Sequence, residues 1–361
     1  MDLGTFLEDF AERDWQVSDP DEGPVRIAVI GLGWWTRAEA IPAIADADLC
    51  ETTVAVSRSA EKARDVVDSV DSVETGLTGE QFHDGRASDA YDAVYVATPN
   101  AHHAEYVATA ADLGKAILCE KPMEASVERA EELVATARGA DVTLMIAYRM
   151  HTEPAVRRLR DLLREGLLGE PAQVHGHMSQ PLLEMIPDPD QWRLDPDVAG
   201  PGASVTDLGI YPLNTARFVL GLDPVAVQAS MASEADAFAD VPDERAAFTA
   251  QFPDGVFASC TASQAAAQSS FVRVIGTEGH ARVEPAFFPD EPRKLVVSRG
   301  GTTVDTTFDQ IDQMEEEFDY FADCVLAGRE PEADGEYGLV DMRAIEAAYE
   351  SAETGQTVAI E

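Results

Sequence analysis

Lysine is scarce in this 361-residue sequence: it occurs at only four positions, 62, 115, 121 and 294. Lysine and arginine together number 26 against 67 aspartates and glutamates, which leaves a formal net charge of −41. The carboxylates are spread along the whole chain rather than gathered in a tail, so the negative charge belongs to the folded surface. At molar salt the Debye length is about 3 Å, which screens most of the repulsion within such a surface. We therefore expect a protein from a halophilic source.

The shortage of cations also limits the possible partners. Proteins bind nucleic acids by displacing counterions with clustered lysine and arginine, and the sequence has no such cluster. It also has no run of eighteen apolar residues, the length of an ordinary transmembrane helix. The first 23 residues are acidic and lack both the basic start and the apolar segment of a secretory signal. We expect a cytoplasmic protein with neither nucleic acid nor a membrane as a partner.

Cysteine and histidine do not occur at spacings that bind metals. The four cysteines are far apart, with no C-x-x-C pair, and we expect them to be reduced and mostly buried. His175 and His177 would lie on one face of a strand, but no carboxylate that could complete a zinc site accompanies them. We expect no metal cofactor.

Strands and helices alternate in the first part of the chain, whose total length favours two domains. After an N-terminal arm over residues 1–24, a doubly wound parallel sheet, the Rossmann domain, is predicted over residues 25–147. Its ligand should lie beyond the carboxyl ends of the strands. The strands are expected at 25–30, 52–56, 93–97, 116–119 and 143–147, and the helices at 36–47, 60–68, 101–113 and 126–138.

The pattern changes at about residue 148. Residues 148–361 predict a second α/β domain for substrate binding and oligomerisation, with one large, mainly antiparallel, open-faced sheet covered by helices on one face. Its strands are expected at 173–178, 226–230, 246–252, 256–264, 271–275 and 294–298, and its helices at 154–165, within 205–220, at 314–326 and at 338–352.

A glycine turn follows the first strand directly. In Gly31-Leu32-Gly33 the missing side chains permit a tight turn and let a pyrophosphate approach the N-terminus of the next helix. Thr36 stands where the dinucleotide fingerprint has a third small residue, so the motif alone fits a plain structural turn equally well. Its place at the first strand of an alternating series favours a dinucleotide site.

The end of the second strand indicates which dinucleotide binds. A site selective for NAD has an acidic residue there for the ribose 2′-hydroxyl, whereas this strand ends in Ser57-Arg58, with Lys62 one turn further on. A hydroxyl and two cations suit a 2′-phosphate, so we predict NADP. The alternative is an exposed helix N-terminus without a ligand.

Two further loops follow strands of the same sheet. One is Thr98-Pro99-Asn100, followed by His103, and the other is Glu120-Lys121-Pro122. A desolvated lysine at a strand end can exchange protons with a substrate or polarise its oxygen, although it could also be an ordinary surface residue.

Together these motifs resemble the glucose-fructose oxidoreductase, inositol dehydrogenase and rhizopine catabolism (Gfo/Idh/MocA) family, from about residue 25 to the C-terminus. Further matching motifs are Ala147-Tyr148-Arg149 and Gly202-x-x-x-x-Asp207-x-Gly209-x-Tyr211. Gln191-Trp192-Arg193 and Tyr211 resemble the glucose-fructose oxidoreductase branch, and the Trp34-Trp35 pair with the acidic surface resembles its NADP-dependent members from halophiles.

The resemblance implies a catalytic set of Lys121, Asp207 and Tyr211. It implies that Arg149, Trp192 and Arg193 close around the nicotinamide, although Trp192 could equally be a packing residue. It also implies that Leu32, Trp34, Trp35 and Glu120 line the cofactor site and that Arg149 and Asn214 contact substrate. Without the resemblance, Asp207 and Tyr211 are four residues apart in an expected helix, so both can face one cleft. A capping aspartate and a core tyrosine would fit that spacing as well.

The implied reaction is NADP-dependent oxidation of an aldopyranose at its anomeric carbon, with D-xylose to D-xylonolactone expected first. Alternatives are a glucose dehydrogenase, a hydride shuttle between two sugars on a tightly bound cofactor, and a regulator that binds the dinucleotide without turnover. The sequence leaves the preferred sugar and the oligomeric state open. We expect a homo-oligomer that pairs through the sheet of the second domain.

Overall fold

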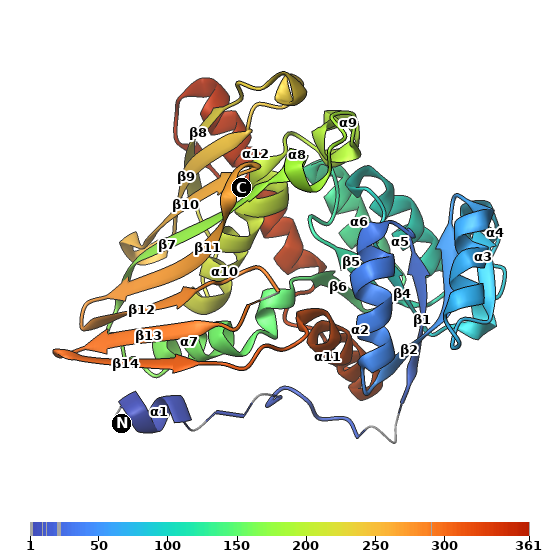
Figure 1. Ribbon diagram of the computed structural model, residues 1–361, viewed down its shortest axis with the longest axis horizontal. Helices are drawn as coiled ribbons and strands as arrows, with labels where there is room; N and C mark the ends of the chain where they lie inside the picture. Colours follow the sequence, from blue (N-terminus) through green and yellow to red (C-terminus); the bar gives the residue numbers. More distant parts are fainter. Residues whose placement is uncertain (1–2, 9, 12, 20–22, 290, 361) are drawn as a thin grey trace. The chain divides into compact units, whose positions relative to one another are not determined.

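The structure, a computed structural model, describes residues 3–8, 10–11, 13–19, 23–289 and 291–360. These form two compact units, whose elements are labelled in Figure 1. The Rossmann unit consists of Trp15–Arg149 and Asp312–Leu339, and the sheet unit consists of the described residues within Met1–Asp14, Met150–Ile311 and Val340–Glu361. Both units are discontinuous in sequence, whereas the sequence pattern predicted a linear division at residues 24 and 147.

The Rossmann unit is built on six parallel strands in the order β3-β2-β1-β4-β5-β6, which confirms the predicted doubly wound sheet. β4 is buried at every residue and therefore reads as a continuous apolar run. β3 was not expected, because only one of its four residues is buried. The strands are β1 (Val25–Ile30), β2 (Cys50–Ser57), β3 (Thr75–Thr78), β4 (Ala93–Val96), β5 (Ala116–Glu120) and β6 (Leu144–Ala147).

Helix α11 (Gln313–Ala327) joins this unit from far along the chain. Met314, Phe318 and Phe321 recur at helical spacing and pack into the same buried cluster as β1. The first helix is irregular, since a π-helical turn (Thr36–Ala40) precedes α2. The other helices are α2 (Ile41–Asp46), α3 (Ala60–Ser69), α4 (Gly79–His83), α5 (His103–Asp112) and α6 (Val127–Gly139).

The sheet unit contains nine strands in the order β14-β13-β12-β11-β7-β10-β9-β8-β15. β7 and β10 are parallel and the other neighbours antiparallel, which confirms the large, mainly antiparallel sheet. β14 was not expected because it has no buried residue and so no hydrophobic pattern. The strands are β7 (Pro171–Pro181), β8 (Ala226–Ala232), β9 (Arg245–Gln251), β10 (Phe257–Ser263), β11 (Ala265–Gly276), β12 (Gly279–Glu284), β13 (Lys294–Arg299), β14 (Thr302–Thr307) and β15 (Val358–Ala359).

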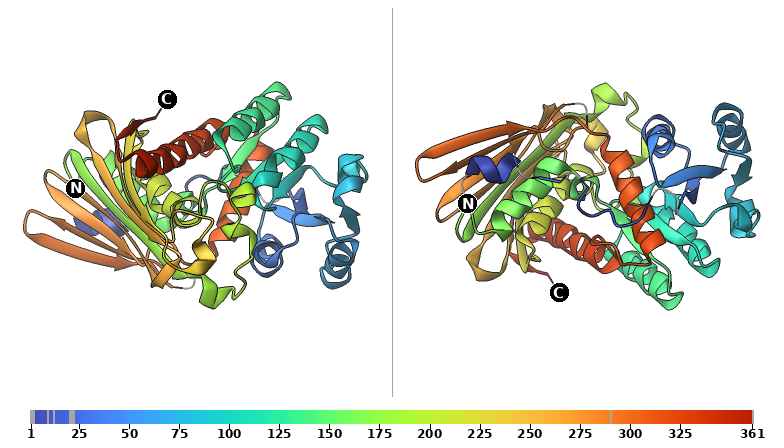
Figure 2. Two further views of the ribbon diagram at one scale, coloured as in Figure 1. Left: turned by 90° about the horizontal axis from the view of Figure 1, so that it is seen from above. Right: turned by 90° about the horizontal axis from the view of Figure 1, so that it is seen from below.

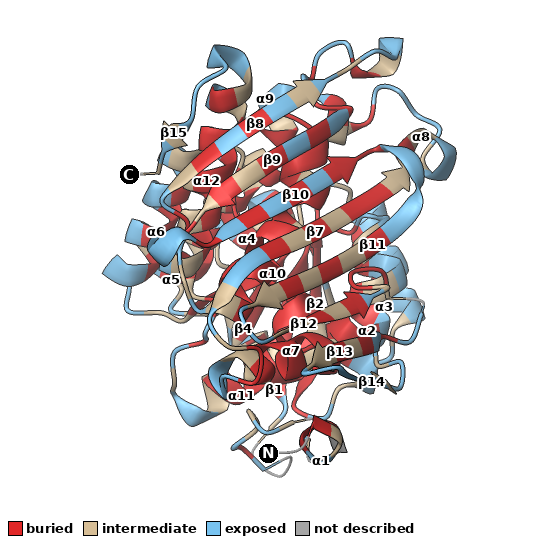
Figure 3. Ribbon diagram, turned by 90° about the vertical axis from the view of Figure 1, so that its left-hand side faces the viewer, coloured by how far each residue is buried: buried red, intermediate tan, exposed pale blue. Residues whose placement is uncertain are grey.

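Helices cover one face of this sheet and leave the other open (Figures 2 and 3). A side chain at Gly176 on β7 would place its Cβ 2.4 Å from the Pro212 ring, so this glycine lets α10 pack closely. Strands such as β10 alternate between buried and exposed residues, as one covered and one open face require. The helices are α1 (Leu3–Glu8), α7 (Pro154–Arg164), α8 (Leu182–Met185), α9 (Pro196–Ala199), α10 (Ile210–Leu220) and α12 (Gly335–Thr354), the last of which begins in the Rossmann unit.

Several of the few cations are used inside the sheet unit rather than on its surface. The Arg217 side chain is 1% exposed and pairs with Asp223 at 2.6 Å and with the fully buried Asp341 at 2.8 Å. The guanidinium of Arg158 on α7 lies 3.6 Å from the centre of the Phe6 ring on α1. Interior pairing of this kind leaves the net negative charge on the outside.

Candidate active site

The glycine turn after β1 is sterically required at its first position. Gly31 has φ +94°, and a Cβ there would lie 2.6 Å from the Ala97 carbonyl oxygen at the end of β4. At Gly33 an added Cβ would meet nothing within 4 Å, so its backbone faces open space beside the helix start. Thr36 replaces the third small residue of the fingerprint, and its hydroxyl donates to the Gly31 carbonyl at 2.5 Å. The threonine therefore holds the turn.

The two tryptophans after the turn have different surroundings. Trp34 is 72% exposed, whereas Trp35 is partly buried and its indole N–H donates to the Tyr95 hydroxyl at 3.1 Å. The guanidinium of the buried Arg149 lies 5.3 Å from the centre of the Trp35 ring, a cation–π distance. Arg149 and Trp35 are therefore neighbours within the Rossmann unit.

The predicted 2′-phosphate residues lie together where β2 meets α3. Ser57 is buried and its hydroxyl accepts a hydrogen bond from the Ser59 amide at 3.2 Å. Arg58 and Lys62 are exposed, Lys62 being in the first turn of α3. Two solvent-facing cations beside a helix N-terminus form an arrangement that can bind a phosphate.

His103 is fully buried and ties two loops together. Its Nε2 lies 2.8 Å from the Thr98 carbonyl oxygen and its Nδ1 lies 3.2 Å from that of Met123. Burial lowers the pKa of the imidazole. Since no part of His103 is exposed, its ring joins the loop after β4 to the loop after β5 from inside the unit. In the same loop the Thr98 Oγ1 atom is buried and has no hydrogen-bond partner among the described residues.

The Lys121 loop is held by a chain of polar contacts. The Tyr95 hydroxyl donates to Glu120 Oε1 at 2.7 Å, and Glu120 Oε2 accepts from the Lys121 amide at 3.1 Å. Glu317 on α11 lies close enough to interact with these charges: burial and the Glu120 charge raise its pKa, while Arg149 and Lys121 lower it. Glu317 escaped prediction because it comes from the far end of the sequence and matches no motif. Only the folded structure shows that its buried carboxylate lies near enough to Lys121 to interact with it.

Asp207 and Tyr211 are the two partly exposed residues in the otherwise buried segment 202–219. Asp207 belongs to a π-helical turn (Val205–Gly209) and Tyr211 to the first turn of α10. π-Helical turns are rare and occur often at functional sites. Tyr211 is therefore not a fully buried core tyrosine, and Asp207 lies inside the turn and not at its N-cap position, which is Ser204. Both polar groups are partly exposed on the sheet unit.

The segment before Asp207 is anchored by a buried carboxylate. Asp243 accepts hydrogen bonds from the amides of Ala203 and Val205, both at 2.7 Å, and from the Tyr349 hydroxyl at 2.6 Å. Burial raises the pKa of Asp243. A Cβ at Gly202 would lie 2.2 Å from Asp243 Oδ1, so glycine is needed there. The motif Gly202-x-x-x-x-Asp207 thus fixes the start of the helix that carries Asp207.

Trp192 and Arg193 lie beside Asp207 in the sheet unit. The Arg193 guanidinium is 4.7 Å from the Trp192 ring centre, and its Nε is 3.6 Å from Asp207 Oδ2. Both side chains are partly exposed. The loop before them is fixed by Gln191, whose amide donates to the carbonyl oxygens of Ile186 and Asp188.

Asn214, the other residue expected at the substrate, is buried inside the unit. Its amide nitrogen donates to Asp341 at 2.7 Å, and its amide oxygen lies 2.9 Å from His151 Nε2. Only 2% of Asn214 is exposed. The structure therefore places its side chain in the buried network around Asp341 and Arg217.

The histidines that could suggest a metal are used otherwise. On β7, His177 lies within 2.7 Å of Thr261 Oγ1 and 3.0 Å of Ser179 Oγ. Among the described residues no group of three or more His, Cys, Asp or Glu side chains is arranged to hold a metal ion. No described helix is long and apolar enough to cross a membrane.

Comparisons with known proteins agree with this arrangement. Residues 25–148 match the oxidoreductase family with an NAD-binding Rossmann fold, GFO/IDH/MocA, and residues 156–282 match the GFO/IDH/MocA C-terminal domain. The two matches cover most of the chain. This chain belongs to the Gfo/Idh/MocA oxidoreductase family.

Individual relatives and a solved structure resemble the chain over most of its length. The chain is 58% identical over the full length of both chains to D-xylose 1-dehydrogenase [NADP(+)] of Haloarcula marismortui. It is 35% identical to D-xylose 1-dehydrogenase (NADP(+)) 2 of Haloferax volcanii, over 76% of this chain and 82% of that one. Among solved structures, aldose-aldose oxidoreductase from Caulobacter crescentus superposes with a TM-score of 0.86 at 31% identity, covering 93% of this chain and 99% of that one.

Proposed function

We propose that this protein is an NADP-dependent D-xylose 1-dehydrogenase, which oxidises the anomeric carbon of the pyranose to give D-xylonolactone and NADPH. The observation that carries the proposal is the full-length identity of 58% to the Haloarcula enzyme with that activity. Oxidation at C1 removes a hydride from carbon and a proton from the C1 hydroxyl. The cofactor accepts the hydride, and the protein aligns the sugar and removes the proton.

NADP is supported by features of the Rossmann unit. The open space at Gly33 leaves room for a pyrophosphate beside a helix N-terminus. Ser57, Arg58 and Lys62 would hold the 2′-phosphate, and the unpartnered Thr98 hydroxyl would hydrogen-bond the dinucleotide. Arg149 beside Trp35 would line the nicotinamide end of the site. No acidic residue stands at the end of β2 to favour NAD.

For the chemistry, Tyr211 acts with Lys121 to remove the C1 hydroxyl proton, and Asp207 orients the sugar by accepting from its hydroxyl groups. Acid–base assistance of this kind accelerates a reaction by about 10² to 10⁴. The exposure of Asp207 and Tyr211 within a buried segment supports their assignment. The Arg193 Nε lies 3.6 Å from Asp207 Oδ2, and the Trp192 ring lies beside the Arg193 guanidinium.

A second candidate is a hydride shuttle between two sugars on a retained cofactor. The likeness to aldose-aldose oxidoreductase at 31% identity favours it. In that reaction NADP stays bound and a second aldose is reduced. An absorbance spectrum of the protein after gel filtration in molar salt distinguishes the shuttle from the dehydrogenase. A retained cofactor contributes its absorbance to the protein fraction, whereas a released cofactor does not.

The experiment that tests the proposal is a screen of aldoses with NADP and with NAD at molar KCl. We expect D-xylose with NADP to give the highest kcat/KM and D-xylonolactone as the product. Glucose as the better substrate would correct the sugar, whereas NADP binding without turnover of any aldose would favour a regulator. Because the reaction consumes NADP⁺ and the four cysteines are free and buried, we assign the enzyme to the cytoplasm.

We also propose that the open face of the large sheet joins copies of this chain. On its three central strands the residues on the open face include no carboxylate, although the chain has 67. Ser259, His175 and Arg273 form one row across the strands, and Thr261, His177 and Phe271 form the next. Such a face can be covered without burying like charges. We expect an oligomer by light scattering in molar salt and dissociation in Ser259→Glu, and an unchanged mass would contradict the interface.

A further inference from the structure

Gln264 lies directly after β10 and is one of the most buried polar residues of the sheet unit. It is 1% exposed, and no motif of the sequence singles it out. Buried amides are retained where their hydrogen bonds are satisfied, since an unpaired one costs about 1 to 3 kcal/mol. The partners of Gln264 therefore indicate what it does.

Its side chain connects Gln180 to Asp207. The amide oxygen accepts from Gln180 Nε2 at 3.0 Å, and the amide nitrogen donates to Asp207 Oδ2 at 2.9 Å. An ionised aspartate only accepts hydrogen bonds, so the nitrogen must face Asp207. Gln180 favours the same orientation because it supplies a donor to the opposite end of the amide.

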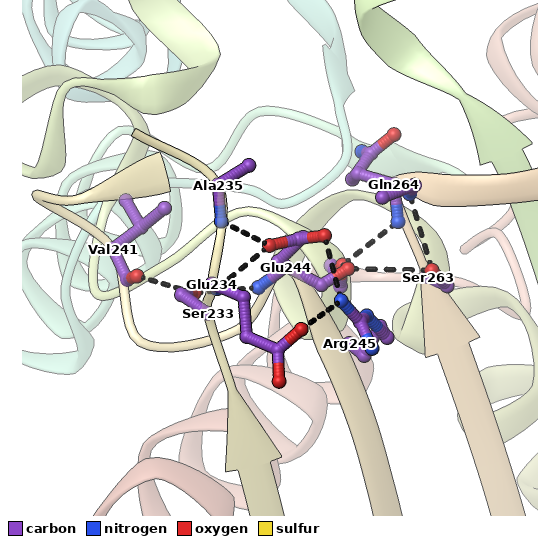
Figure 4. A network of polar contacts seen from close by, with 10 residues as sticks. Ser233, Glu234, Ala235, Val241, Glu244, Arg245, Ser263 and Gln264 are labelled. Carbon is purple, nitrogen blue, oxygen red and sulfur yellow. Dashed lines mark hydrogen bonds and ion pairs between the residues drawn. The ribbon is translucent and has the colours of Figure 1, made fainter. Parts of the chain in front are cut away.

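Its backbone is fixed from the other side. The Gln264 amide donates to the Glu244 carbonyl oxygen at 3.0 Å and contacts Ser204 Oγ at 3.1 Å. Figure 4 shows that Glu244 is itself held, since its carboxylate accepts from the amides of Glu234 and Ala235 at 2.8 and 2.9 Å. Those two backbone contacts lower the pKa of Glu244. The backbone of Gln264 is thus held by hydrogen bonds at the end of β10, and its side chain reaches the partly exposed carboxylate of Asp207.

We propose that Gln264 is a positioning residue for the sugar-orienting carboxylate: it holds Asp207 Oδ2 in one rotamer and supplies a neutral donor that keeps the carboxylate an acceptor for sugar hydroxyls. The proposal rests on the proposed role of Asp207. Asp207 can rotate about two side-chain bonds, and a fixed donor from β10 removes that freedom before the sugar arrives. Arg193 approaches the same oxygen at 3.6 Å from a 3-10 helical turn (Trp192–Leu194), whereas Gln264 approaches from the end of β10.

Two variants of Gln264 test the inference through kcat/KM for D-xylose. Gln264→Met keeps the length of the side chain but removes its hydrogen bonds to Gln180, to Asp207 and, at 3.4 Å, to the Ala203 carbonyl oxygen. We expect a loss of roughly ten- to a hundredfold. Gln264→Glu keeps the shape but turns a second carboxylate toward Asp207. At low pH the protonated glutamate can donate as the amide does, and at high pH the two carboxylates repel. The ratio of Gln264→Glu to wild-type activity should therefore fall as pH rises.

A double-mutant cycle separates positioning from a purely structural role. If Gln264 acts through Asp207, Gln264→Met should cause no more than about a threefold further loss in the Asp207→Asn enzyme. Losses that multiply fully, together with a pH-independent Gln264→Glu ratio, would overturn the inference. An Asp207→Asn enzyme with normal activity would instead contradict the proposed role of Asp207 itself.

A matched control and a folding measurement show whether a loss of activity is specific to Gln264. Gln251→Met makes the same substitution at the end of the neighbouring strand β9, and it should leave kcat/KM unchanged. Thermal midpoints of all variants in molar KCl report whether they fold. If Gln264→Met is unfolded, Gln264→Glu and its pH dependence decide the question, because it has the same shape as the native side chain.

Discussion

The Tyr95 hydroxyl lies between Trp35 and Glu120: it accepts from the Trp35 indole N–H at 3.1 Å and donates to Glu120 Oε1 at 2.7 Å. Tyr95 is fully buried on β4, and burial together with the Glu120 charge raises its pKa. One hydroxyl thereby joins the helix after the glycine turn to the loop that carries Lys121.

Removing this hydroxyl should destabilise the Rossmann unit. Tyr95→Phe leaves the indole N–H and Glu120 Oε1 each without its partner, at a cost of about 1 to 3 kcal/mol. Tyr91→Phe is the matched control, because the buried Tyr91 hydroxyl has no hydrogen-bond partner among the described residues. Thermal melting in molar KCl should show a lower midpoint for Tyr95→Phe and an unchanged or higher one for Tyr91→Phe. Equal effects would show that the hydrogen bonds contribute nothing.

Glu317 should make stability depend on pH. Burial raises the pKa of Glu317 in the folded state well above 4.5, its ordinary value. As pH rises above about 4.5, the carboxyl loses its proton in the unfolded chain but keeps it in the folded protein. The free energy of unfolding therefore decreases with rising pH until the folded-state pKa is reached. Glu317→Gln carries no such proton. The midpoint of the variant relative to wild type should therefore be higher at pH 8 than at pH 5. Each unit of pKa corresponds to about 1.4 kcal/mol. A difference that does not change with pH would contradict the assignment.

Arg58→Ala should weaken NADP far more than NAD. A charge-assisted hydrogen bond to the 2′-phosphate contributes about 1.5 to 3 kcal/mol, or roughly ten- to a hundredfold in Kd. Arg64→Ala, at an exposed arginine within α3, is the control and should affect both cofactors little. Fluorescence titration with each dinucleotide measures the change. Equal losses for NADP and NAD would show that Arg58 does not recognise the phosphate.

Lys121→Met should abolish most turnover while the fold and NADP binding persist. A group that moves a proton in the transition state affects kcat more than KM, by about 10² to 10⁴. Lys115→Met, at a lysine that donates to the Tyr91 carbonyl, is the control. Tyr211→Phe should resemble Lys121→Met. Since both act on one proton, the double variant should be little worse than the worse single one, and fully multiplied losses would exclude a shared proton.

Salt should stabilise the protein strongly. With a net charge of −41, the folded surface repels itself in dilute buffer, and molar KCl screens that repulsion. The thermal midpoint should rise from dilute buffer to molar KCl. Sucrose of equal osmolality is the control, because it favours the compact state without screening charge. A midpoint that is flat or falls with KCl would contradict the role of the surface charge.

Much of the Rossmann sheet and of the large sheet was predictable, because buried strands of a parallel sheet are apolar runs and half-buried strands alternate. β3 and β14 were missed because only one residue of β3 and none of β14 is buried, too few to leave such a pattern. β12 was missed although Ala281 and Val283 alternate with less buried residues. His103 and Asn214 show the same limit in the site. Their positions were noticed in the sequence, but their surroundings were not predictable: both side chains bind other parts of the protein interior.

By itself the sequence determined the features that follow from local stereochemistry and charge: the glycine turn at Gly31, the alternation of strands and helices, the cations after β2 and the acidic surface. Only the tertiary structure decided which polar groups support the site. Gln264 and Asp207 are 57 residues apart in sequence, and Glu317 reaches the Lys121 loop on a helix from the end of the chain. The physical reason is that a hydrogen bond or a buried charge depends on what packing brings within a few ångströms, and no local pattern records a partner so distant in the sequence.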